Sequence, residues 1–177
     1  MKTINYLAIL VALHIFLFAC TANSQSQDVN KSEQSPAMSL KIETLYKSTQ
    51  CGPSVQTQWI ADQSLFEKLF QGTRQQMISP GLPAPTSSID FSKYGVLLVS
   101  MGQQRTGGYS VELAREEMQL SDGVVQISVH WREPAPDMML TQALTHPCIF
   151  LKVAQGDYDV VRVVDQENRV HAEITVI

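Results

Sequence analysis

The sequence predicts a mainly β domain of the α+β class, an antiparallel sheet or sandwich-like fold with one short helix near its N-terminal end. Three observations lead to this prediction: short stretches alternate between apolar and polar residues, turn residues separate them, and one stretch has helical periodicity. The chain has 177 residues, of which 44% are hydrophobic. That length suits one domain with an adequate core and not a second full domain.

The first expected strand is Leu40–Lys47, where apolar and polar residues alternate, and Val55–Ile60 is a candidate for the second. The segment 62–72 predicts the helix, because four large apolar side chains recur on one face. Asp62 or Ser64 can cap its start, and Gly72 can end it. Residues 79–87 hold three prolines and predict a loop.

The rest of the chain has a β pattern. Gly95–Met101 is a short apolar run, which favours a buried strand. The Asp122-Gly123 step favours a hairpin turn, and short turns between alternating strands favour antiparallel pairing. The further expected strands are Tyr109–Arg115, Val124–Trp131, Cys148–Ala154, Asp159–Val164 and Arg169–Val176.

The N-terminus has the pattern of an export signal. Lys2 precedes an apolar run from Ile4 to Phe18, which is shorter than the roughly 20 residues that span a bilayer. The junction Leu17-Phe18-Ala19-Cys20 resembles the bacterial lipobox. We therefore expect a lipoprotein signal peptide at residues 1–19 and lipidation of Cys20, with a plain secretory signal as the alternative.

The expected organisation follows from this signal. Residues 20–39 comprise the lipidated cysteine and a polar, Ser/Gln/Asn-rich flexible tether, and residues 40–177 form the β domain. Several acyl chains at Cys20 would hold the protein on a membrane. Thr21, and not an aspartate, follows the cysteine, so we expect a bacterial cell-envelope protein on the outer membrane, facing the periplasm.

Charge and residue pattern exclude several classes of function. The net charge of -4 argues against a nucleic-acid binder. His130, His146 and His171 lack metal-ligand spacing, so we expect no metal site. No Gly-x-Ser-x-Gly element or acid–base carboxylate pair is evident. We therefore expect no catalytic residue, no cofactor and no small-molecule substrate, and hence no enzyme.

Two groups of residues remain as candidate sites. Once Cys20 is lipidated, Cys51 and Cys148 are left as a pair that an oxidising compartment can bridge, although two buried thiols are the alternative. The glycine-rich loop Arg105-Thr106-Gly107-Gly108-Tyr109 lies between two expected strands. It is either a tight β connection or a protein-contact loop with Arg105 and Tyr109 as anchors; a phosphate cradle is a weaker alternative, since no helix follows.

Several motifs make the chain, over about residues 50–165, similar to the C-terminal domain of the protease complex subunit PrcB family. The Thr-Gly-Gly-Tyr-Ser element and the Thr-Gln-Ala-Leu-Thr-x-Pro element carry most of the resemblance. The similar segments are Trp59–Phe70, Asp90-Phe91, Gly95–Val99, Gly102–Glu112, Val124–Val129, Thr141–Pro147 and Ile149–Val153.

The resemblance implies a non-enzymatic, envelope-anchored accessory protein, because the namesake of the family is a lipoprotein that binds and stabilises a surface protease complex. We expect its protein partner, a protease or another envelope protein, to contact the loop from Arg105 to Tyr109 together with His146 and Pro147. The alternatives are a chagasin-like peptidase inhibitor, since the Thr-Gly-Gly-Tyr loop faintly resembles an inhibitory loop of that class, and a structural envelope lipoprotein without a dedicated partner.

Overall fold

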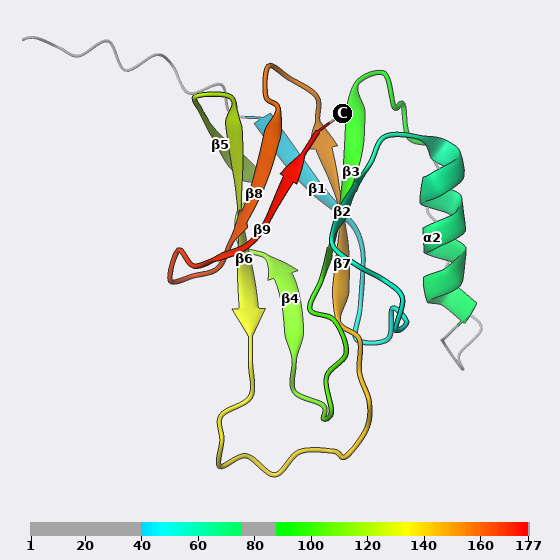
Figure 1. Cartoon of the computed structure of the whole chain (residues 1–177), viewed down its shortest axis with the longest axis vertical. Helices are drawn as coiled ribbons and strands as arrows, with labels where there is room; N and C mark the ends of the chain where they lie inside the picture. Colours follow the sequence, from blue (N-terminus) through cyan, green and yellow to red (C-terminus); the bar gives the residue numbers. More distant parts are fainter. Residues whose placement is uncertain (1–39, 76–87, 177) are drawn as a thin grey trace, which may run out of the picture. The chain divides into compact units, whose positions relative to one another are not determined.

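A computed structural model describes residues 40–75 and 88–176 (Figure 1). The expected signal peptide, Cys20, the tether and the proline loop at 79–87 lie outside these residues. The described elements are β1 (Leu40–Ser48), β2 (Gln58–Ile60), α2 (Gln63–Gln75), β3 (Tyr94–Ser100), β4 (Ser110–Leu113), β5 (Glu117–Ser121), β6 (Val124–Arg132), β7 (Cys148–Ala154), β8 (Val160–Val164) and β9 (Val170–Thr175). The domain is mainly β with one described helix, as the sequence predicts.

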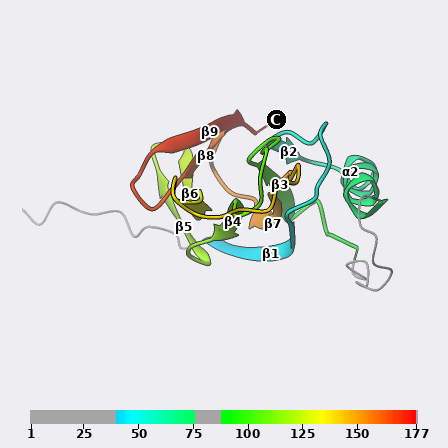
Figure 2. The same cartoon turned by 90° about the horizontal axis from the view of Figure 1, so that it is seen from below.

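The nine strands form one nearly closed sheet. Their order is β2-β3-β7-β1-β5-β6-β8-β9, and β4 pairs with β6 beside β5. The two end strands, β2 and β9, contact each other. Seen along the strands, the sheet curls around a central core (Figure 2).

All strand pairs are antiparallel except β6 and β8, which run parallel from the pair Val124 and Val160 to the pair Ser128 and Val164. The parallel pair arises because the chain leaves β6, forms β7 between β1 and β3, and then returns to the free edge of β6. Side chains along β8 alternate between the two faces of the sheet whether the strand pairs in parallel or antiparallel, so this alternation does not reveal the direction of pairing. The sequence therefore predicts these strands but not this exception.

The core lies inside the curled sheet. Alternate residues of β3 and β7, such as Leu97, Val99, Ile149 and Leu151, point into it, and they are fully buried. The residues between them are buried too, against the helix. Burial on both faces explains why the apolar run within Gly95–Met101 is continuous from Val96 to Val99. The inner core consists of Ile42, Leu97, Val99, Met101, Val111, Met118, Val125, Ile127, Val129, Ile149, Leu151, Val153, Tyr158, Val161 and Val163.

Helix α2 covers the outer face of β3 and β7 with an aromatic cluster. Phe66 and Phe70 stack with ring centroids 5.5 Å apart, and Phe150 of β7 meets Phe70 edge-on at 5.7 Å. The Leu65 N–H donates to the Asp62 carboxylate over 2.8 Å, so Asp62 caps the helix start. None of the described helical segments is long and apolar enough to cross a membrane.

The helix does not end at Gly72, as the sequence suggests, but continues to Gln75. Gly72 is exposed, and its φ is not in the left-handed region that a helix-ending glycine adopts. The next residue, Thr73, is fully buried, and its hydroxyl donates to the Phe70 carbonyl over 2.7 Å. A glycine inside a helix costs only about 1 kcal/mol relative to alanine, so packing of the following turn overrides the stop signal.

A side-chain amide closes the edge of β6 beyond the end of β8. The Trp131 N–H donates to the Gln166 Oε1 over 3.0 Å, and the Gln166 Nε2 donates to the Trp131 carbonyl over 3.1 Å. Because β8 ends at Val164, no β8 backbone continues the ladder at Trp131. The amide of Gln166 takes the place of the next peptide group.

Candidate functional site

Two loops at one end of the sheet form the candidate site. Residues 101–109 connect β3 to β4, and residues 133–147 connect β6 to β7; together they are called the double-loop end, at the bottom of Figure 1. The Gln104 N–H donates to the Thr145 carbonyl over 2.8 Å, and the Thr145 N–H donates back over 2.9 Å. This pair of bonds is a small antiparallel bridge between the loops.

Further hydrogen bonds fix the loops to each other. The Gly107 N–H donates to the Thr141 carbonyl over 3.0 Å. The Thr145 hydroxyl donates to the Thr106 carbonyl over 2.9 Å, and the Met101 N–H donates to the Pro147 carbonyl over 2.9 Å. The two segments singled out in the sequence are thus brought together, as a contact surface built from both would require.

Gly108 is the point where the second loop packs on the first. Its φ is +90°, a conformation that L side chains rarely adopt. A Cβ atom there would lie 3.1 Å from both Pro134 and Leu140. Pro134 and Leu140 are half-buried, and they hold the chain between them in place. The glycine is therefore explained by a close approach of the two loops.

The predicted contact residues of the first loop are not equally available. Arg105 and Gly108 are exposed, and Thr106 and Gly107 are half-buried. Tyr109 is half-buried and packs against the inner core. Its ring therefore helps to support the sheet, and among the predicted contact residues from Arg105 to Tyr109, Arg105 has the exposed side chain that can serve as an anchor.

His146 and Pro147, predicted as partner contacts, have buried side chains, so in this conformation they offer no surface to a partner. The backbone of His146 explains its position: its N–H donates to the Thr49 carbonyl over 2.8 Å, and its carbonyl accepts from the Cys51 N–H over 2.9 Å. His146 Nε2 is buried and has no hydrogen-bond partner among the described residues. The segment joins the double-loop end to residues 49–51.

Sequence reasoning missed the apolar tip of the second loop. Met139 is 100% exposed, and Met138 and Leu144 are each 56% exposed. Every residue from Ala135 to Met139 is exposed. A signal was present, since Met138-Met139-Leu140 is an apolar run within a loop that begins with two prolines. Adjacent large apolar side chains that are both exposed, as Met138 and Met139 are, are typical of interaction sites.

A disulfide lies directly behind the double-loop end. Cys51 and Cys148 are bonded, with their Cα atoms 6.0 Å apart. Both are buried beside the aromatic cluster under α2. These are the two cysteines that the sequence pairs once Cys20 is set aside. The bond joins the segment after β1 to the first residue of β7, which follows Pro147.

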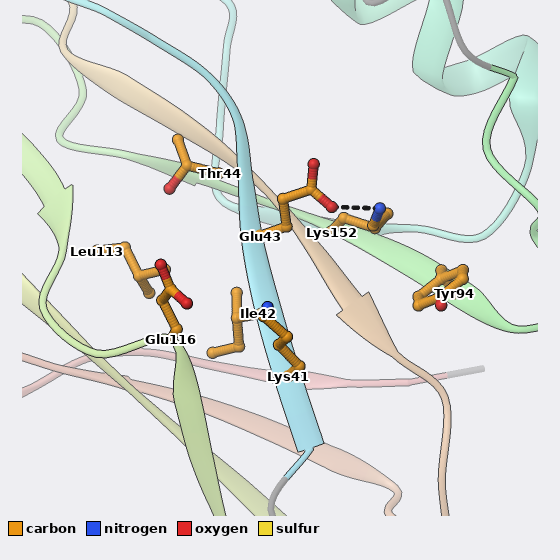
Figure 3. Close-up of a pocket in the computed structure, with 8 residues that line it drawn as sticks. All are labelled: Lys41, Ile42, Glu43, Thr44, Tyr94, Leu113, Glu116 and Lys152. Carbon is orange, nitrogen blue, oxygen red and sulfur yellow. Dashed lines mark ion pairs between the residues drawn. The ribbon is translucent and has the colours of Figure 1, made fainter.

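A hollow of about 400 Å³ lies along β1, where this strand leaves β5. Figure 3 shows Leu113 and Glu116 on one side of β1, and Tyr94 and Lys152 on the other. Lys152 pairs with Glu43 and lies over the Tyr94 ring, 5.0 Å from its centroid. Lys152 and Glu43 therefore satisfy each other's charge at the surface of the hollow. The hollow has no arrangement of nucleophile, base and orienting group that could carry out a reaction.

Nearby, the Lys47 ammonium of β1 lies 2.7 Å from the Glu112 carboxylate of β4, and this lysine lowers the pKa of Glu112. Both side chains are largely exposed, so the pair adds little stability. It links β1 to β4, two strands that no backbone ladder joins directly in the described sheet.

The turn between β8 and β9 contains the most buried charge among the described residues. Asp165 is 2% exposed, and its carboxylate accepts from Arg169 Nε at 2.7 Å and lies 3.0 Å from His171 Nε2. The His171 ring stacks on Trp131 with centroids 3.8 Å apart. Within the described chain, no three His, Cys, Asp or Glu side chains are placed to hold a metal ion. The geometry of the cluster is that of a braced turn.

The segment that contains both loops matches a known protein family. Residues 96–154 match the family model described as PrcB C-terminal, and they run from β3 to β7. No curated protein and no solved structure gives a significant match to the chain. The family is that of a protease-associated accessory domain. The match confirms the similarity to the PrcB family that the motifs of this segment indicate.

Proposed function

We propose that this protein is a non-enzymatic accessory module of the bacterial cell envelope, which binds a protease or another envelope protein through its double-loop end. One observation carries the proposal. The segment that matches the PrcB C-terminal family contains both loops, and five hydrogen bonds described above tie these loops into one surface. A preorganised surface binds with a smaller entropy loss than two independent loops would.

The contact surface is Arg105 of the first loop and Met138, Met139 and Leu144 of the second. Arginine is enriched among the residues that dominate binding energy, and methionine adapts its shape to irregular apolar partners. All four side chains are exposed in the described chain. Burying them against a partner would remove apolar area from water, which is the main driving force for association.

The lipobox-like junction Leu17-Phe18-Ala19-Cys20 supports anchoring by a lipid on Cys20, and the direction of β1 shows where the described domain begins. β1 starts beside Met118 of β5 and ends beside Cys148, the first residue of β7. The domain thus begins at the end of the sheet away from the double-loop end (Figure 1). In this proposal the lipid holds the chain at the periplasmic face of the outer membrane, and the partner meets the loops at the end of the sheet opposite the start of β1.

The test is crosslinking in native envelopes, followed by mass spectrometry of the captured protein. We expect a double variant with Arg105→Ala and Met139→Ser to capture a specific envelope protein about tenfold less well, because anchor residues carry most of the binding energy. Val170→Ser is the matched control, since Val170 is 54% exposed on β9. Circular dichroism shows whether each variant keeps its fold.

Equal capture by the double variant and the native chain would contradict this surface. If the Val170→Ser control loses capture to the same extent, the cause is a general loss of apolar surface. That result would also contradict the proposed contact surface. A papain inhibition assay on the same preparations distinguishes an accessory module from a peptidase inhibitor.

A further inference from the structure

We propose that Met138 and Met139 form an oxidation site, at which a peroxide converts exposed thioethers to sulfoxides and so switches off the apolar part of the contact surface. The site itself follows from exposure and packing. Its effect on partner binding rests on the proposed function, and the experiments below separate the two.

The backbone presents both methionines to solvent. Pro134 and Leu140 pack at Gly108 and hold the two ends of the tip. Between them the chain turns, with the Met138 N–H donating to the Ala135 carbonyl over 3.1 Å. Because the ends are fixed and the tip has no core to enter, the side chain of Met139 stays 100% exposed.

Two other methionines of the same domain are natural controls. Met101 is 8% exposed and Met118 is 3% exposed, and both belong to the inner core. Thioether oxidation follows access of the oxidant to sulfur. Among the residues that the structure describes, the domain therefore offers one pair of accessible methionines and one pair that the core protects.

The reaction needs hydrogen peroxide and no protein catalyst. A sulfur lone pair attacks one peroxide oxygen, the O–O bond breaks, and a proton shift releases water. The thioether and hydrogen peroxide thus yield a sulfoxide and water; sulfur loses two electrons and the peroxide gains them. The product is a polar, chiral side chain in place of an apolar one.

The change alters binding because of where it occurs. Two of the three large apolar side chains on the contact surface become polar, and a sulfoxide loses favourable energy when it is buried without a hydrogen-bond partner. Methionine sulfoxide reductases reverse the reaction. Oxidation is therefore a reversible way to release a partner without unfolding the domain.

The first experiment maps oxidation in the folded, disulfide-intact protein. Treatment with hydrogen peroxide is followed by peptide mass spectrometry over time. We expect Met139 and Met138 to gain oxygen at least about tenfold faster than Met101 and Met118, because access to sulfur sets the rate. In denaturant the four rates should converge. Equal rates for all four in the folded protein would overturn the site.

The second experiment measures the consequence with a variant that keeps apolar bulk but has no sulfur at the tip, Met138→Leu with Met139→Leu. We expect peroxide to shorten retention of the native protein on a phenyl column and to reduce capture of the crosslinked partner about tenfold. Reductase treatment should restore both, and the leucine variant should change in neither assay.

Unchanged capture by a native protein that mass spectrometry shows to be oxidised would overturn the switch. Equal losses in the leucine variant would place the effect elsewhere in the molecule and overturn it too. If untreated protein captures no partner, the proposed function fails, while the mapping experiment and the phenyl column still decide whether the site exists.

Discussion

At the scale of single residues, Gly95 leaves no room for an added side-chain atom. It lies in β3, and a Cβ atom there would sit 1.9 Å from Cζ2 of Trp59. Trp59 of β2 packs against the inner core, with its ring edge-on to Tyr158 at 6.4 Å. The indole therefore occupies the space that a side chain would need, and it helps to close the sheet beside β9.

We expect Gly95→Ala to lower the free energy of unfolding by about 1–3 kcal/mol, because overpacking displaces the indole. Gly72→Ala is the matched control. No atom lies within 4 Å of a Cβ placed at Gly72, so alanine should raise the free energy of unfolding by about 0.5–1 kcal/mol through helix propensity. Urea unfolding followed by tryptophan fluorescence measures both, and a shift in the same direction for the two variants would contradict the argument.

At the scale of elements, the turn from β8 to β9 depends on one carboxylate. Burial alone would raise the pKa of Asp165. Hydrogen bonds from His171, from the backbone and side chain of Arg169 and from the backbone of Glu167 outweigh that effect and hold the pKa well below its ordinary value. The ionised form therefore braces the turn from several directions.

Because folding lowers the pKa of Asp165, the free energy of unfolding must decrease as the pH falls through the acidic range. The contribution of Asp165 is fully present above the pKa of the unfolded chain, about 3.9, and it is lost as the pH falls toward the folded value. We expect acid unfolding curves of Asp165→Asn to have a shallower slope below about pH 4 than those of the native chain. Identical slopes in urea titrations at several pH values would show that Asp165 does not contribute.

At the scale of the whole molecule, the Cys51–Cys148 bond closes a loop that contains most of the described residues. The cysteines are 97 positions apart in the sequence. A crosslink over a loop of that length restricts the unfolded chain and contributes about 4–5 kcal/mol in the chain-entropy model. Its position behind His146 also holds the base of the double-loop end.

We therefore expect the double variant Cys51→Ala with Cys148→Ala to have a free energy of unfolding that is lower by about 4–5 kcal/mol. It should therefore unfold at a markedly lower urea concentration. Alkylation checks the bond directly: in denaturant without reductant neither cysteine should react, and after reduction both should. Modification of both thiols in unreduced mature protein would show that the bridge is absent.

How much of the molecule the sequence predicts depends on whether the signal is local. The Asp122-Gly123 turn follows directly from its residues, and both have positive φ as a two-residue hairpin requires. Strand β3 (Tyr94–Ser100) follows from the apolar run Gly95–Met101. Helix length, the parallel pair of β6 and β8, and the burial of His146 depend on packing between distant segments, which no local pattern encodes.

The candidate site shows the same division. The glycines of the first loop signal a special backbone, but only the structure shows that Gly108 accommodates Pro134 and Leu140. Tyr109 has the residue type of a contact anchor, yet its ring packs on the core. The exposure of Met139 depends on how the loop ends are fixed, so its residue type alone did not identify it.

The amide of Gln166 affects whether copies of this protein can aggregate with one another. An open strand edge is a template for pairing with another chain, and within the described residues that template is covered at Trp131 by Gln166 of the β8–β9 turn. Because Asp165 braces the same turn, acid that protonates its carboxylate also loosens the cover. The carboxylate that stabilises the fold thereby also guards the protein against aggregation through β6.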